Sequence, residues 1–140
     1  MGLDAVVYRN IESLPESLRE QVKVVDHQTG ELEVASGPRL TETLLAADVR
    51  IGNISGVAWL REQIESRWPE KCSLILNLVL YSSTHSGDFI TLDQVGQIKL
   101  EIAGIDCADD SIPPRLAAFF EQMTELVNAA ECEGNPIAFH

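Results

Sequence analysis

Residues 113–134 read PPRLAAFFEQMTELVNAAECEG and form the longest helix that the sequence predicts. The apolar side chains of this stretch recur three or four residues apart, which places them on one face of an α-helix. They are Leu116, Phe119, Phe120, Met123, Val127 and Ala130. The prolines at its start and Gly134 at its end are typical helix boundaries. A helix with this apolar face must pack against other elements, so the rest of the chain has to supply a surface for it.

Two more helices with the same spacing are predicted upstream. The first covers residues 55–68, with Ser55 as the expected N-cap and Pro69 as the stop signal. Its apolar positions are Val57, Leu60, Ile64 and Trp68. The second begins at Thr91, because residues 91–94 have the form of a capping box. Its apolar positions are Val95, Ile98, Ile102 and Ile105.

The first part of the chain is richer in β-branched and aromatic residues and predicts strands. Residues 3–8 have the composition of a first strand. Residues 22–26 and 31–35 alternate in polarity on either side of a glycine-containing turn, which indicates a hairpin. Between them, Ser13 is the expected cap of a short helix that has Pro15 in its first turn.

Three segments complete the expected fold. Residues 74–81 (LILNLVLY) are apolar at nearly every position, so we predict a buried strand there, with a helix as the alternative that periodicity leaves open. Residues 40–50 are ambiguous, with a helical turn over residues 41–47 as one reading, and residues 136–139 predict a short edge strand. The sum is a single α+β domain over residues 1–140, a mostly antiparallel sheet covered by about three helices.

The chain is strongly acidic, with 22 acidic and 10 basic side chains and a formal net charge of −12. This charge repels the phosphates of nucleic acid and anionic lipid headgroups, so we expect neither nucleic acid nor a membrane as a partner. The same charge speeds encounter with a basic protein or a cation. Solubility alone explains the acidity equally well.

The cysteines and the N-terminus favour a cytoplasmic location. Cys72, Cys107 and Cys132 are odd in number and widely spaced, without a C-x-x-C pair, which is typical of reduced thiols. The first residues lack the basic region of a signal peptide, and the longest apolar run is less than half of the ~20 residues that span a bilayer. We therefore expect a cytoplasmic protein.

Residues 81–88 (YSSTHSGD) are the candidate binding loop, because they gather hydrogen-bonding side chains directly after the most apolar element. The candidate residues are Tyr81, Thr84, His85, Ser86 and Asp88. A serine nucleophile with His85 as base is one hypothesis, but residues this close in a tight turn rarely align as a catalytic triad. The structural alternative is a polar turn in which Gly87 supplies a positive φ.

A second set of residues is the candidate protein interface. Trp59 lies beside the apolar stripe of its helix, where either core packing or an interface role fits it. The acidic candidates are Glu62, Glu65, Asp88, Asp109 and Asp110. The spacing of acidic residues, histidines and cysteines matches neither an EF-hand nor a zinc site, so we expect no metal and no cofactor.

The chain resembles a group of small bacterial proteins of uncharacterised function. The resemblance rests on the opening MGLDAVVY, on Gly52 to Ser55 with Trp59, on the YSxTHSGD segment and on the closing NPI. In size, acidity and lack of catalytic motifs the chain also looks like the immunity proteins that neutralise bacterial toxins. The first resemblance implies a bacterial cytoplasmic origin. The second implies a basic protein, a cognate toxin, as the partner.

The sequence thus predicts a non-catalytic protein-binding domain. The most specific form of this prediction is an immunity protein that acts by occlusion. The alternative is a small enzyme, or a ligand- or metal-binding module, centred on residues 85–88.

Overall fold

A computed structural model describes residues 2–34 and 44–140 of the chain. The elements in chain order are β1 (Gly2–Tyr8), η1 (Ile11–Ser13), α1 (Glu16–Arg19), β2 (Val22–Asp26), β3 (Glu31–Val34), β4 (Leu45–Asn53), α2 (Ile54–Arg67), η4 (Ile75–Val79), β5 (Phe89–Ile90), α3 (Leu92–Ala103), α4 (Pro114–Glu133) and β6 (Ile137–Phe139). The predicted first strand, hairpin and three longer helices are therefore confirmed. Residues 35–43, which include the expected end of the hairpin and the start of the ambiguous segment, lie outside the described residues.

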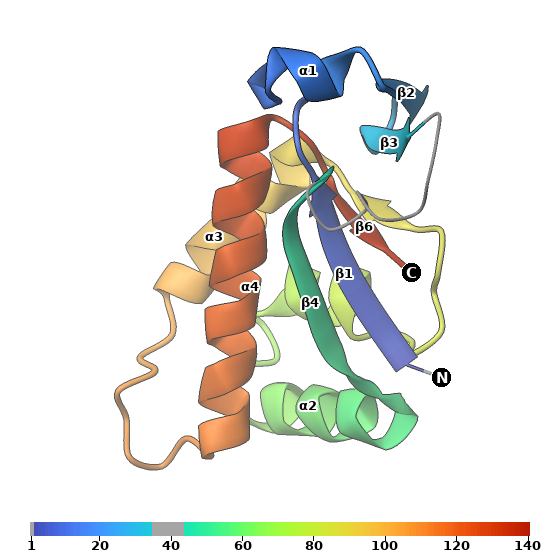
Figure 1. Cartoon of the computed structure of the whole chain (residues 1–140). Coiled ribbons are helices and arrows are strands. Elements are labelled where there is room, and N and C mark those ends of the chain that lie inside the picture. The colour runs from blue at the N-terminus through green and yellow to red at the C-terminus, as the bar shows by residue number, and fades with distance from the viewer. Residues whose placement is uncertain (1, 35–43) are drawn as a thin grey trace.

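The strands form an antiparallel sheet in the order β4-β1-β6-β5, while β2 and β3 pair separately as the hairpin. Helix α4 runs alongside β4, and α2 lies at one end of the sheet (Figure 1). The hairpin and α1 lie at the opposite end (Figure 1). This arrangement confirms the predicted α+β class with a mostly antiparallel sheet covered by helices.

The side chains of β1 belong to two apolar clusters, because successive side chains of a strand point to opposite faces of the sheet. Leu3, Ala5 and Val7 belong to the main core, which the helices close. Val6 and Tyr8 pack with Ala138 in a smaller cluster on the other face. Tyr8 and Ala138 of this smaller cluster also line a surface cleft.

Helix α4 fills the main core as its apolar spacing predicts. Phe120 is 1% exposed, and its ring meets the rings of Trp68 and Phe119 edge-on at centroid distances of 5.7 and 5.5 Å. The helix ends at Gly134, whose φ of 68° is a left-handed conformation that glycine adopts without strain.

The strand predicted over residues 74–81 is wrong, because this segment is helical and includes the π-helical turn η4. Ile75 and Val79 are buried four residues apart, while Asn77 between them is exposed, a helical distribution of burial. Glu101 of α3 stabilises the start of the turn, since its carboxylate accepts the backbone N–H groups of Leu74 and Ile75 at 2.9 and 3.1 Å. A carboxylate at this position replaces the local cap that the sequence lacks.

The helical turn considered for residues 41–47 is wrong for residues 45–47, which begin β4. Ala47, Val49 and Ile51 are buried, while Asp48 and Arg50 between them are exposed. This period of two is typical of a strand with one buried face. Residues 41–43 lie outside the described part of the chain.

Three further expectations need correction. The last strand, β6, is an inner strand between β1 and β5, not an edge strand. Its end also meets the start of β1, because His140 and Asp4 exchange backbone hydrogen bonds at 2.9 and 3.3 Å. Asn53 rather than Ser55 caps α2, since the Asn53 side chain accepts the N–H of Gly56 at 2.8 Å. Ser13 lies within η1, and Pro15 occupies the cap position of α1.

Candidate functional site

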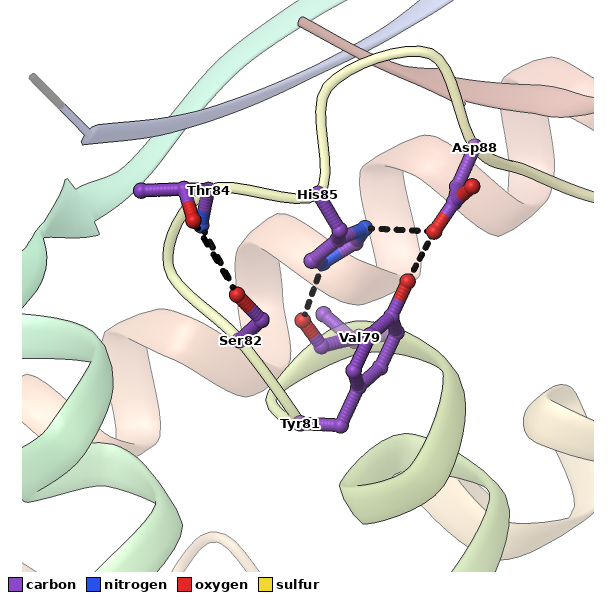
Figure 2. Close-up of polar contacts among 6 residues, drawn as sticks. All are labelled: Val79, Tyr81, Ser82, Thr84, His85 and Asp88. Atoms are coloured by element: carbon purple, nitrogen blue, oxygen red, sulfur yellow. Dashed lines mark hydrogen bonds and ion pairs between the residues drawn. The ribbon is translucent and has the colours of Figure 1, made fainter.

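The loop between η4 and β5 is held in place by the imidazole of His85. Its ring is buried, with 8% of the residue exposed, and Nε2 lies 2.8 Å from the backbone carbonyl oxygen of Val79 (Figure 2). A carbonyl oxygen only accepts hydrogen bonds, so Nε2 carries the proton and donates it. This bond satisfies a carbonyl at the end of the π-helical turn, where the intrahelical pattern leaves acceptors without partners.

Aromatic rings enclose the imidazole on two sides. Tyr81 stacks on His85 at a centroid distance of 4.4 Å, and Phe139 of β6 meets it edge-on at 4.4 Å. The Tyr81 hydroxyl donates a hydrogen bond to Oδ2 of Asp88 (Figure 2). Three residues of the candidate loop, Tyr81, His85 and Asp88, therefore lie together.

Within residues 2–34 and 44–140, no group forms a hydrogen bond with the second ring nitrogen of His85. Nδ1 is fully buried and points at Asp88, with 3.6 Å between Nδ1 and Oδ2 (Figure 2). The carboxylate of Asp88 therefore lies within ion-pair distance of the buried imidazole. Buried polar groups without partners are uncommon in native proteins, and this one lies directly behind Asp88.

Backbone hydrogen bonds fix the end of the loop to β6. Gly87 has the predicted positive φ, 97°, and its N–H donates to the carbonyl of Phe139 at 2.9 Å. The N–H of Phe139 donates to the carbonyl of Asp88, also at 2.9 Å. The carboxylate of Asp88 is thereby held at the edge of a surface cleft.

This surface cleft, which we call the acidic cleft, has a volume of 240 Å³. It is lined by Tyr8, Asp26, Thr29, Glu31, Ser86, Gly87, Asp88, Ala138, Phe139 and His140. The hairpin forms one wall, and residues 86–88 with the end of β6 form the other. Two carboxylates of the hairpin, Asp26 and Glu31, and that of Asp88 thus line one opening.

Tyr8 lies in the wall of the acidic cleft, and its pKa responds to the negative charge there. Burial, followed by the nearby carboxylates of Glu31 and Asp26, raises the pKa of Tyr8 to about 12. Its hydroxyl also lies 3.1 Å from Nε2 of His140. On the other side of the loop, desolvation and then the hydrogen bond to Asp88 raise the pKa of Tyr81 to about 12.

No known protein family, curated protein or solved structure matches this chain. The site is therefore interpreted from its own geometry.

Two predicted residues of the loop do not join the group around His85. Thr84 is exposed and turns back on the loop, with its backbone N–H 3.1 Å from the hydroxyl of Ser82 (Figure 2). Ser86 is exposed and lines the acidic cleft. Among the described residues, neither ring nitrogen of His85 forms a hydrogen bond with Ser86, so a Ser-His-Asp triad is not assembled.

The predicted interface residues lie elsewhere. Trp59 is half-buried against the main core, with the guanidinium carbon of Arg115 5.5 Å from its ring centroid. Glu62 and Glu65 are exposed on α2, and Glu65 pairs with Arg61 at 3.1 Å. Asp109 and Asp110 are exposed in the loop before α4. The backbone N–H of Ser111 hydrogen-bonds to Asp109 and lowers its pKa. Only Asp88 of the predicted acidic face reaches the acidic cleft.

The residues that sequence reasoning missed are Tyr8, Asp26 and Glu31. They lie far from the loop in the chain, and only the folded hairpin brings them to Asp88. In residues 2–34 and 44–140, no group of three or more histidine, cysteine or acidic side chains is arranged to hold a metal ion. Within the same ranges, no helix is long and apolar enough to cross a membrane. All three cysteines are free thiols.

The two tyrosines of the chain give a test of the charge at the site. Because both pKa values are raised from 10.0 to about 12, the folded protein keeps its phenolic protons where the unfolded chain releases them. Their contribution to stability is present below pH 10.0 and is lost as the pH rises through about 12. We expect the tyrosinate absorbance of the native protein to rise near pH 12, and that of the denatured protein near pH 10.0.

In the variant Tyr81→Phe, Tyr8 is the remaining tyrosine, so the tyrosinate absorbance of this variant belongs to Tyr8. Circular dichroism of the same samples separates ionisation of the folded protein from alkaline unfolding. A native protein in which either tyrosine ionised near the ordinary value would contradict the charge and burial described above.

Proposed function

We propose that the protein acts by binding a basic protein partner rather than by catalysing a reaction. Its mode of action would be that of an immunity protein that neutralises a cognate bacterial toxin by occlusion. The observation that carries this proposal is the acidic cleft, which is lined by Asp26, Glu31 and Asp88 and, among the described residues, by no lysine or arginine.

Charge supports the proposal both at long range and at contact. The net charge of −12 attracts a basic surface over many ångströms and raises the rate of encounter. At contact, the acidic cleft offers the carboxylate of Asp88 on a wall whose backbone is tied to β6 by hydrogen bonds of Gly87 and Asp88 with Phe139. A preformed wall loses little conformational entropy on binding, which favours affinity.

Catalysis at the same loop has weaker support. A general base needs a free ring nitrogen within hydrogen-bond reach of the proton that it removes. In His85, Nε2 is committed to the Val79 carbonyl, and Nδ1 is buried behind Asp88. The imidazole is thus positioned to support the loop.

The proposal is tested by capturing the partner. The tagged protein is incubated with an extract of its source cells, and an unrelated acidic protein of similar isoelectric point serves as the control bait. We expect one basic protein to be captured in a 1:1 complex by this protein alone. With the purified partner, the association rate should fall by about tenfold or more between low and moderate salt, with a smaller change in the dissociation rate.

Two outcomes would count against the proposal. One is a captured partner that is acidic, or whose association rate does not change with salt. The other is turnover of a substrate by the isolated protein that is lost in His85→Ala while the fold is retained, since this result would establish the enzymatic alternative.

A further inference from the structure

We infer that strand β4 is the interface of a symmetric homodimer, in which it pairs antiparallel with β4 of a second copy of this chain. The inference goes beyond the proposed function, because β4 contributes no residue to the lining of the acidic cleft. It is argued from the position of β4 in the sheet, the direction of its backbone groups and the order of its charges.

The position of β4 leaves one of its sides without a strand partner. Among the described residues, β4 pairs only with β1, and it lies at one end of the sheet order (Figure 1). It is 9 residues long, whereas β5 at the opposite edge has 2 residues. A long edge strand presents backbone donors and acceptors that pair readily with another strand.

The hydrogen bonds of β1 show which backbone groups of β4 point outward. Asp4 exchanges both of its backbone hydrogen bonds with His140, so the backbone groups of Asp4 face away from β4. Arg50 lies opposite Asp4, and Asp48 lies opposite Val6, two residues further along β1. Opposed residues of an antiparallel pair direct their backbone groups either at each other or away from each other. The N–H and C=O groups of Asp48 and Arg50 therefore point to the open side of β4.

A side chain of α4 supports this direction. Gln122 donates a hydrogen bond from Nε2 to the backbone carbonyl oxygen of Arg50 at 3.3 Å. The donor comes from outside the ladder of β1 and β4, so this carbonyl is directed at the outer side of the sheet. A carbonyl oxygen has two lone pairs, so it can accept a second hydrogen bond from a paired strand.

The charges of β4 select a second copy as the partner and fix the register. The side chains of Asp48 and Arg50 are exposed and lie on the same face of the sheet, on either side of Val49. When two β4 strands pair antiparallel about Val49, Asp48 of each copy lies opposite Arg50 of the other, and opposite charges in this position stabilise a strand pair. A register centred on Asp48 or on Arg50 instead places like charges opposite each other, which is unfavourable.

Both side chains are available for this pairing. Among the described residues, Asp48 forms no ion pair. Arg50 binds Asp4 of its own chain at 2.9 Å, and about half of the Arg50 side chain, 53%, is still exposed. A guanidinium has several N–H donors, so it can bind Asp4 and the incoming carboxylate together. The backbone pairs in the same register, because Asp48 and Arg50 are the residues whose N–H and C=O groups point outward.

Sedimentation velocity of the full chain tests the dimer. Measurements are made at moderate salt, where the long-range repulsion between two copies of net charge −12 is screened. We expect the wild type to change from monomer to dimer between about 1 µM and about 1 mM protein. Asp48→Arg and Arg50→Asp each place like charges opposite each other, so each should raise the dimer dissociation constant by at least about tenfold. The control Glu70→Arg makes the same charge change as Asp48→Arg at an exposed residue outside β4 and should not weaken the dimer.

Mixing the two variants of β4 gives a sharper test. Asp48→Arg carries two cations on the edge of β4 and Arg50→Asp carries two anions, so each variant repels itself and attracts the other. We expect the mixture to form a heterodimer at least about tenfold tighter than either variant forms with itself. A variant that fails to fold cannot give this result, because an unfolded chain has no strand edge to pair, and circular dichroism checks the fold of each.

Amide hydrogen exchange locates the contact. The N–H of Asp48 points outward, so its exchange should slow as the protein concentration rises through the dimer transition. The N–H of Val49 points to β1 and is the internal control, since the fold of a single chain already protects it.

Several outcomes would overturn the inference. One is a wild type that stays monomeric up to about 1 mM. The others are a dimer that both variants of β4 leave intact, a mixture of these variants that forms no heterodimer, and an N–H of Asp48 that exchanges at the same rate at every protein concentration.

Discussion

Replacing Phe120 by alanine should lower the free energy of unfolding by about 3–5 kcal/mol, the largest stability effect that we expect from a single substitution. Phe120 is 1% exposed and joins α4 to the segment after α2 through its edge-on contact with Trp68. The loss combines the transfer of the ring out of water with the cavity that remains. Domains of this kind have stabilities of about 5–15 kcal/mol, so the variant should lose a large share of its stability.

Urea unfolding followed by tryptophan fluorescence measures this effect, because Trp68 lies against the mutated ring. Leu100→Ala is the control, since Leu100 is 73% exposed on α3 and its truncation should change stability by no more than about 0.5 kcal/mol. Equal effects of the two substitutions would contradict the packing of α4 against the core.

Replacing His85 by leucine should destabilise the protein by about 1–3 kcal/mol, although leucine is apolar and fits a buried position. The substitution removes the donor that Nε2 provides and leaves the Val79 carbonyl without its partner. It also removes the ring that stacks between Tyr81 and Phe139. The loop should therefore loosen where it carries Asp88, and hydrogen exchange of residues 81–88 should become faster.

The matched control for this substitution is His27→Leu. His27 is exposed beside the hairpin turn, so this change should alter stability by no more than about 0.5 kcal/mol. If His85→Leu were as stable as the wild type, the hydrogen bond to the π-helical turn would not support the loop, and the buried nitrogen would need another explanation.

The helices could be predicted because their apolar residues repeat with a single period. In α4 and α3 the spacing, the capping box at Thr91 and the glycine at position 134 all agree. Residues 74–81 defeat this reasoning because nearly every position is apolar, so the period disappears. Their helical state depends on Glu101, a capping group from another helix that no local pattern reveals.

Strand β4 could not be predicted for a different reason. Its alternation of Ala47, Val49 and Ile51 with Asp48 and Arg50 is present in the sequence. The leucines and alanines at its start, residues 44–47, also suit a helix. Pairing with β1 decides the outcome, since most of β4, from Leu45 to Asn53, lies opposite residues of the first strand. Tertiary contacts here override local propensity.

The candidate site could be predicted only in part from the sequence. The loop of residues 81–88 could be found because its polar residues are adjacent in the chain, and three of them do converge. Asp26 and Glu31 could not be assigned to it, because their approach to Asp88 depends on how the hairpin docks beside β6. Contacts between distant segments carry no local signal in a single sequence.

The position of β6 between β1 and β5 has a consequence for folding kinetics. Asp4 and His140 are hydrogen-bonded neighbours, so the centre of the sheet is completed by the contact with the greatest separation along the chain. Closing so large a loop costs entropy before the strands gain their hydrogen bonds, which slows folding. A short covalent link between the strands that carry Asp4 and His140 would turn this distant pairing into the closure of a local hairpin, and the sheet could then grow outward from its middle.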